Sequence, residues 1–211
     1  MDIARFKAKP ILGILRGIKQ EQLQPLLEAI EASGLESIEI TMNTPAAADL
    51  IRKAVKISGA RLMIGAGTVL SLDDLKSAWD SGASFMVTPV FIKEVAEYCV
   101  KNTIPFFPGA LTPLEIYNAW NEGATMVKVF PAKIFGPDYF KEIRGPFRDI
   151  KLLACAGVTP ENLRDYFSNG ASAVSFGASV FRPDWIENME YNKITLAIKR
   201  YVEILPLCKK E

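Results

Sequence analysis

Histidine is absent from this 211-residue sequence. Its absence excludes Ser-His-Asp and Cys-His catalysis and every zinc site that needs a histidine ligand. Acid–base chemistry near neutral pH must therefore come from Asp, Glu, Lys, Tyr or Cys side chains whose pKa values are shifted.

Cysteine is scarce, with three residues that lie far apart in the chain, Cys99, Cys155 and Cys208. They form neither a disulfide framework nor a CxxC metal motif, which favours a reducing cytoplasm. The first residues lack the apolar stretch of a signal peptide, and no apolar run approaches the ~18 residues of a membrane span. We therefore expect a cytoplasmic protein without a membrane partner.

Charge of either sign is not in excess, since 25 Lys and Arg oppose 24 Asp and Glu, for a net charge of +1. This balance argues against a nucleic-acid partner but leaves room for a local pocket that binds one small anion. Apolar residues make up 49% of the chain and charged residues 23%, as in ordinary globular domains. We expect one domain over residues 1–211.

Short apolar segments recur at a nearly steady spacing and are apolar throughout, as is typical of strands covered on both faces. The eight segments are Pro10–Leu15, Ser37–Thr41, Leu62–Ile64, Phe85–Thr88, Ile104–Phe107, Met126–Phe130, Leu152–Cys155 and Ala173–Phe176. Amphipathic stretches of helical period lie between them, among them Gln22–Ser33, Leu72–Ser81 and Phe91–Asn102.

Helix boundaries have recognisable signals. Ser71 is a candidate N-cap, and three Thr-Pro pairs combine an N-cap with proline at the first helical position: Thr44-Pro45, Thr112-Pro113 and Thr159-Pro160. Helices should end near Gly34, Gly59, Gly82, Gly123 and Gly170. Eight strand–helix units predict an α/β fold, a single-domain (β/α)8 TIM barrel, with a short helix in Met1–Lys9 that closes its bottom. The alternative is an open, doubly wound sheet of about six strands.

Lys128 interrupts the otherwise apolar strand Met126–Phe130. Alternation places it on the face opposite Val127 and Val129, and burial can lower a lysine pKa, which makes the neutral amine a nucleophile toward carbonyls. The alternative is a lysine that extends from the strand end to solvent.

Two other charged residues stand near strand ends. Glu39, within Ser37–Thr41, needs a partner if it is buried, and Lys128 is the natural one. Such a pair is either structural or a proton-transfer device. Arg16 closes the first strand and suits a planar carboxylate, although a solvated loop arginine fits the sequence equally well.

Small residues follow the last two strands, where (β/α)8 barrels commonly bind phosphate. Backbone N–H groups can approach an anion closely at Ala156-Gly157 and at Gly177-Ala178-Ser179.

Taken in order, the motifs ILRG, IEIT-x-N-T-P, GAGTV, VTP, PG, VKVFPA-x-x-FGP, AGVTPEN and FGAS resemble those of the KDPG/KHG aldolase family. The resemblance covers nearly the whole chain. It implies a homotrimeric (β/α)8 barrel, a class I aldolase without metal or organic cofactor. Its substrates would be small molecules, a 2-keto-3-deoxy-6-phospho-sugar acid of gluconate or galactonate type, cleaved to pyruvate and glyceraldehyde 3-phosphate. It would also cleave 4-hydroxy-2-oxoglutarate to pyruvate and glyoxylate.

The resemblance also implies roles for individual residues. Lys128 would form the Schiff base and Glu39 would be the general acid/base. The remaining substrate-binding residues would be Arg16, Thr41, Asn43, Thr68, Pro89, Phe130, Cys155, Gly157, Gly177 and Ser179.

Three positions depart from the family pattern. Asn43 stands where gluconate-type members often have an arginine, so Arg16 would hold the substrate carboxylate, as in galactonate-type members. Ala156 replaces the first glycine of the phosphate loop, and Cys155 replaces a residue tied to sugar stereochemistry. Lys133 could add positive charge near the phosphate, and the plainer interpretation is a solvated loop lysine. The alternative function is a phosphate-binding barrel of another kind, either an epimerase or isomerase or a metabolite-binding module.

Overall fold

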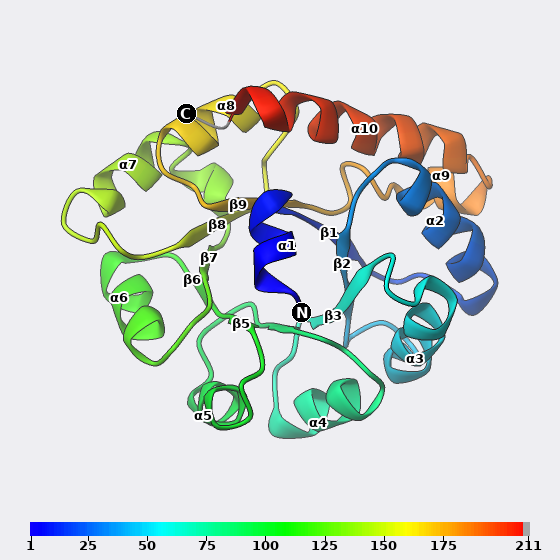
Figure 1. Cartoon of the computed structure of the whole chain (residues 1–211), viewed down its shortest axis with the longest axis horizontal. Helices are drawn as coiled ribbons and strands as arrows, with labels where there is room; N and C mark the ends of the chain where they lie inside the picture. Colours follow the sequence, from blue (N-terminus) through cyan, green and yellow to red (C-terminus); the bar gives the residue numbers. More distant parts are fainter. Residues whose placement is uncertain (209–211) are drawn as a thin grey trace.

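The computed structural model describes residues 1–208 and has helices arranged in a ring around a parallel sheet (Figure 1). The strands are β1 (Ile11–Leu15), β2 (Ser37–Thr41), β3 (Met63–Gly67), β4 (Met86–Val87), β5 (Phe106–Phe107), β6 (Gly109–Ala110), β7 (Val127–Val129), β8 (Leu152–Cys155) and β9 (Ala173–Phe176). The α-helices are α1 (Ile3–Ala8), α2 (Gln20–Ala32), α3 (Ala47–Ser58), α4 (Leu72–Asp80), α5 (Lys93–Lys101), α6 (Pro113–Asn121), α7 (Asp138–Arg144), α8 (Leu163–Ser168), α9 (Pro183–Glu187) and α10 (Tyr191–Cys208). A short 3-10 helix, η1, spans Ala132–Ile134.

The sheet runs in the order β5-β4-β3-β2-β1-β9-β8-β7-β6. β5 and β6 are two parts of one barrel strand, interrupted at Pro108, which has no N–H to donate. On one side, the N–H of Met86 donates to the carbonyl of Pro105, and on the other the N–H of Lys128 donates to the carbonyl of Pro108. The sheet therefore closes as an eight-stranded barrel, which confirms the predicted fold and excludes the open sheet.

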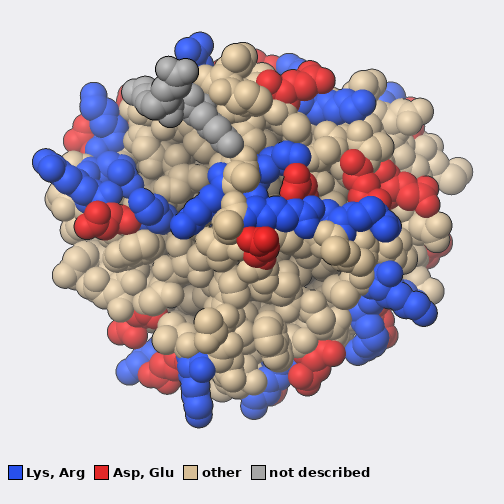
Figure 2. Space-filling view, viewed as in Figure 1, with Lys and Arg blue, Asp and Glu red and all other residues tan. Residues whose placement is uncertain are grey.

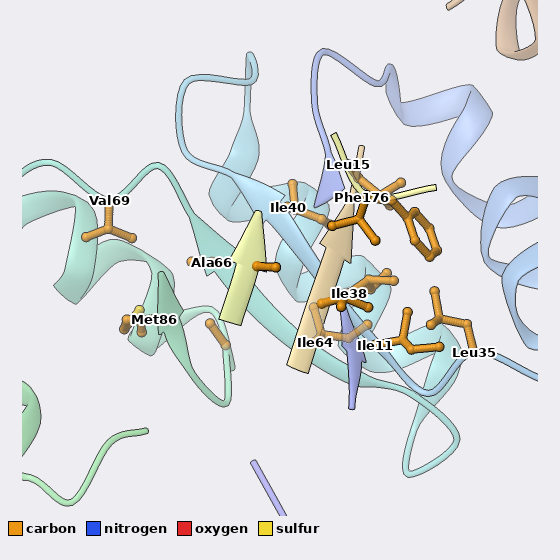
Figure 3. Close-up of a cluster of buried hydrophobic side chains, with 14 of the residues drawn as sticks. Ile11, Leu15, Leu35, Ile38, Ile40, Ile64, Ala66, Val69, Met86 and Phe176 are labelled. Atoms are coloured by element: carbon orange, nitrogen blue, oxygen red, sulfur yellow. The ribbon is translucent and has the colours of Figure 1, made fainter. Parts of the chain in front are cut away.

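Outward-facing side chains of the strands pack under the helices. Figure 3 shows part of this layer, in which Ile38 and Ile40 of β2 lie among Ile11, Leu15 and Ile64. Because successive side chains of a strand point to opposite faces, the residues between them point into the barrel.

The inside of the barrel holds a second apolar cluster, formed by Leu12, Met63, Phe85, Val87, Phe107, Met126, Leu153, Cys155 and Ala173. Phe6 of α1 belongs to it, is fully buried and contacts Phe107 edge to face. Helix α1 lies across the centre of the ring in Figure 1, so the prediction of an N-terminal helix that closes the barrel is confirmed.

Ion pairs connect α1 and the residue after it to the barrel. Arg5 and Lys9 both pair with Glu36, which directly precedes β2. Figure 2, in the same view, shows basic side chains crossing the middle of this face with acidic ones among them. Because α1 covers the bottom of the barrel, we expect a site at the opposite end, where the strands reach their carboxyl termini.

Two of the predicted helix starts are wrong. Helix α3 begins at Ala47, after Ala46 in a left-handed conformation, and the Thr44 hydroxyl accepts a hydrogen bond from the N–H of Gly17. Helix α8 begins at Leu163, and Thr159 instead exchanges hydrogen bonds with Asn162 in the preceding turn. The caps at Ser71 and Thr112 are confirmed.

Candidate active site

Lys128 projects into the barrel from β7 and is only 6% exposed. Its neighbours Val127 and Val129 face outward into the layer under the helices, as the alternation predicts. The Lys128 Nζ lies 5.3 Å from the centroid of the Phe130 ring, over its face. The lysine does not extend to solvent, which excludes that alternative.

Glu39 projects into the barrel from β2 and is 1% exposed. Burial raises the pKa of its carboxyl group above 4.5, while the positive charges of Lys128 and Arg16 act in the opposite direction. Its Oε2 atom has no hydrogen-bond partner in the described part of the chain. A buried carboxyl group with an oxygen that lacks a hydrogen-bond partner can exchange a proton with a bound molecule.

Arg16 follows β1 at the same end of the barrel, and its Nη2 donates to the Thr68 hydroxyl over 3.2 Å. Thr68 directly follows β3. This contact brings together two predicted binding residues, a guanidinium and a hydroxyl, beside the Glu39 carboxyl that the arginine charge influences.

Thr44 supports the loop that carries Arg16. Its buried hydroxyl accepts a hydrogen bond from the Gly17 N–H over 3.0 Å and lies 3.0 Å from the Thr41 hydroxyl. Sequence reasoning missed this role because a threonine before a proline is also typical of a helix cap. Thr41, predicted to bind substrate, is fully buried and takes part in this support.

A cleft of about 420 Å³ opens beside these residues. Six predicted residues line it, namely Arg16, Phe130, Cys155, Gly157, Gly177 and Ser179. It is also lined by Ser175 and Lys133, which the predicted set of binding residues did not include. Ser175 could have been found from the period of two in Ala173–Phe176, since Ala173 points into the barrel.

Cys155 lies at the inner end of the cleft and is buried. Burial raises the pKa of its thiol, against the influence of the nearby Lys128 charge and a hydrogen bond with Ser175. We therefore treat Cys155 as a neutral, space-filling group in the wall of the cleft.

The loop after β8 turns sharply, with Ala156 at φ 72° and Gly157 at φ 89°. Positive φ is uncommon for alanine, so this turn is held by its surroundings. The Ala156 carbonyl accepts a hydrogen bond from the Lys133 N–H, and Gly157 lies against Lys133, where a Cβ atom would come within 2.4 Å of the lysine Cβ. The loop after β8 is thereby joined to η1.

Four of the predicted binding residues do not line this cleft, namely Thr41, Asn43, Thr68 and Pro89, and neither do Lys128 and Glu39. Pro89 and Phe130 border a neighbouring cleft of about 470 Å³, so Phe130 stands between the two. Asn43 is exposed and makes no hydrogen bond to another residue of the 1–208 range.

A larger cavity, of about 510 Å³, lies at the opposite end of the barrel near Met1 and Trp79. No lysine, arginine or carboxylate side chain lines it. Within residues 1–208 there is no group of His, Cys, Asp or Glu side chains suited to a metal ion. No helix in the same range is long and apolar enough to cross a membrane.

A buried lysine and a buried carboxyl group inside the barrel, next to a cleft whose wall includes the Cys155 that contacts the lysine, suit an enzyme that works on carbonyl compounds through a Schiff base. Comparison with known proteins agrees. The model of the KDPG and KHG aldolase family matches residues 3–197. The chain therefore belongs to this family and is a class I aldolase.

Relatives with assigned activities span nearly the whole chain. It is 31% identical to 2-dehydro-3-deoxy-6-phosphogalactonate aldolase of Escherichia coli K12, over 92% of this chain and 95% of that protein. It is 32% identical to 2-dehydro-3-deoxy-phosphogluconate aldolase of Pseudomonas aeruginosa, over 92% of this chain and 90% of that protein.

Solved structures of the family have the same fold. A native KDPGal structure superposes with a TM-score of 0.88 at 29% identity, over 94% of this chain and 95% of the other. The KDPG aldolase of Legionella pneumophila, in which pyruvate is captured as a covalent carbinolamine, gives 0.87 at 26% identity, over 94% and 97% of the two chains.

Proposed function

We propose that this chain reversibly cleaves a 2-keto-3-deoxy-6-phospho-sugar acid, of gluconate or galactonate type, to pyruvate and glyceraldehyde 3-phosphate. Cleavage of 4-hydroxy-2-oxoglutarate to pyruvate and glyoxylate is part of the same proposal. The observation that carries it is the presence of Lys128 and Glu39 together inside the barrel, where each is almost fully buried and the charge of the lysine acts on the carboxyl group. The names of the relatives support this substrate class.

The reaction begins when the neutral amine of Lys128 attacks the C2 ketone of the substrate. Glu39 transfers the protons that convert the carbinolamine to an iminium ion and water. The Glu39 carboxylate then accepts the proton of the C4 hydroxyl. As the C3–C4 bond breaks, its electrons move into the iminium group to give an enamine, and the aldehyde leaves. Protonation at C3 and hydrolysis release pyruvate and restore the free lysine.

The other residues hold the substrate. Arg16 binds the C1 carboxylate through its guanidinium fork, with Thr68 beside it. Phe130, Pro89 and Thr41 shape the pyruvyl end, and Asn43 adds a polar contact at the rim. Gly157, Gly177 and Ser179 line the part of the cleft that takes the phosphate, and Cys155 faces the sugar carbons. No step needs a metal ion or an organic cofactor.

Assembly and location belong to the same proposal. We expect residues 1–211 to form one aldolase domain, and the protein to be a cytoplasmic homotrimer. Exposed apolar side chains, including Leu70, Leu114, Ile134 and Phe135, support association of subunits. Light scattering should then give three times the 23.3 kDa mass of one chain.

Borohydride trapping with pyruvate tests the mechanism. We expect an intact-mass increase that peptide mapping places on Lys128, and no adduct in Lys128→Ala. If the folded wild-type protein forms no adduct, the aldolase proposal fails, and Lys128 and Glu39 form a structural pair in a barrel that only binds metabolites. If the adduct forms, cleavage assays with the two epimeric phospho-sugar acids and with 4-hydroxy-2-oxoglutarate identify the preferred substrate.

A further inference from the structure

The side chain of Lys133 borders the active-site cleft. The residue belongs to η1, directly after the β7 strand that carries Lys128. It is exposed, and its ammonium group has no hydrogen bond or ion pair with another residue of the described range 1–208. Other lysines, such as Lys9 and Lys193, pair with a glutamate.

Lys133 is held in place by its backbone. Its N–H donates to the Ala156 carbonyl over 3.1 Å, and its Cβ lies against Gly157. The lysine stem is therefore fixed to the loop that turns at Ala156 and Gly157, while the ammonium group remains free to bind a ligand.

The charge of the cleft is of one sign. Arg16 and Lys133 are its charged lining residues, and no carboxylate lines it. The two cations follow β1 and β7, which are separated in the sheet by β8 and β9. They therefore flank the loops after β8 and β9 from two sides, which suits a molecule with an anionic group at each end.

Backbone donors lie between these cations. The N–H groups of Gly157, Ala178 and Ser179 donate to no acceptor within residues 1–208, and all three residues line the cleft. Such N–H groups bind phosphate oxygens, and an ammonium group beside them adds a charge-assisted bond.

We infer that Lys133 binds the terminal phosphate of the substrate and makes the enzyme prefer phosphorylated over unphosphorylated keto-deoxy sugar acids. This inference rests on the proposed function. Arg16 holds the carboxylate end in both kinds of substrate, so the contribution of Lys133 is specific to the phosphorylated one.

The test compares Lys133→Met with Lys141→Met, an equal change of net charge on the exposed side of α7. For Lys133→Met we expect kcat/KM to fall about tenfold with the phosphorylated substrate, mostly through KM, as for loss of one charge-assisted contact. It should change less than twofold with the unphosphorylated sugar acid. Inorganic phosphate should inhibit this variant about tenfold less well, and Lys133→Arg should restore most of the difference.

Borohydride trapping with pyruvate separates the two possible failures. A wild-type protein that forms no adduct removes the proposed function itself. Suppose the adduct forms equally in wild type and Lys133→Met. The proposed role of Lys133 is then wrong if the variant's kcat/KM falls by the same factor with the phosphorylated and the unphosphorylated substrate, or if inorganic phosphate inhibits it as well as it inhibits wild type. The proposed role is also wrong if kcat/KM with the phosphorylated substrate falls as much in Lys141→Met as in Lys133→Met.

Discussion

Gly67 lies directly against the carboxyl group of Glu39. A Cβ atom on Gly67 would stand 2.3 Å from the Glu39 Oε1 and 2.6 Å from its Cδ. Gly67 pairs with Thr41 in the register of β3 on β2, and both Gly67 and Glu39 point into the barrel. The glycine thus provides the space in which the buried carboxyl group sits.

Gly67→Ala should therefore displace the Glu39 carboxyl group. We expect it to lower the free energy of unfolding by about 1–3 kcal/mol, as overpacked cores do, and to reduce kcat about a hundredfold as the acid/base group is lost. Chemical denaturation and steady-state assays measure the two effects. In a Glu39→Ala background the methyl group has room, so the stability cost should disappear. A cost that persists there would mean that the strand itself, not the carboxyl group, requires glycine.

Glu39 gives the protein a characteristic pH dependence. Its pKa is raised by burial, so the folded state favours the protonated form. Its contribution to stability is complete below about pH 4.5 and is lost as the pH rises through the raised pKa, because the unfolded chain releases the proton first. Glu39→Gln should therefore gain stability relative to wild type as the pH is raised above 4.5, while kcat falls about 10²–10⁴-fold.

Glu36→Gln is the matched control for that measurement. Burial alone would raise the pKa of Glu36, but hydrogen bonds from Lys9 and Arg5 hold it below 4.5. Its stabilising contribution is present above pH 4.5 and is lost as the pH falls through the lowered pKa. Denaturation curves from pH 3 to 8 should thus show opposite trends for the two variants, and parallel trends would contradict the assignment.

Thr44 should affect substrate binding more than stability. Thr44→Val leaves the Gly17 N–H and the Thr41 hydroxyl without their partner, at a cost of about 1–3 kcal/mol. The loop that carries Arg16 then loosens, and KM for the carboxylate substrate should rise several-fold with a smaller change in kcat.

Thr112→Val is a control of similar cost, because it removes a helix cap worth about 1 kcal/mol on α6. Its hydroxyl does not touch the Arg16 loop, so KM should stay at the wild-type value. Equal KM effects in the two variants would assign the change at Thr44 to lost stability.

Strand periodicity explains how much of the site the sequence predicts. The alternation around Lys128 and Glu39 puts both inside the barrel, because neighbouring apolar residues need the helix layer. Local patterns fail where a tertiary contact takes over, as when the Thr44 hydroxyl meets Gly17 instead of capping a helix. They also cannot show that Pro108 divides one strand into β5 and β6, or that the GAGTV motif contributes Gly67 as well as Thr68. Both features depend on neighbours that are distant in the chain.

Phe6 connects the N-terminal helix to the barrel interior. Its ring is fully buried and lies 5.8 Å from the ring of Phe107, at 70° to it. Phe6→Ala removes this contact and leaves a cavity under the inner apolar cluster, so we expect the free energy of unfolding to fall by about 3–5 kcal/mol. Phe6→Leu keeps most of the volume and should lose about half as much.

The same substitution tests whether the two ends of the barrel are independent. Phe6 enters the inner apolar cluster from α1 at the bottom of the barrel, whereas Lys128 lies outside the cluster, beside its members Leu153 and Cys155 at the opposite end. Below its lowered melting temperature, Phe6→Ala should therefore form the pyruvate adduct at the wild-type rate. Borohydride trapping at 15 °C measures this rate, and circular dichroism at the same temperature shows whether the variant is folded. A slower reaction in a sample that is still fully folded would mean that the packing of α1 reaches the lysine, and that the inner cluster sets the position of Lys128 as well as the stability of the barrel.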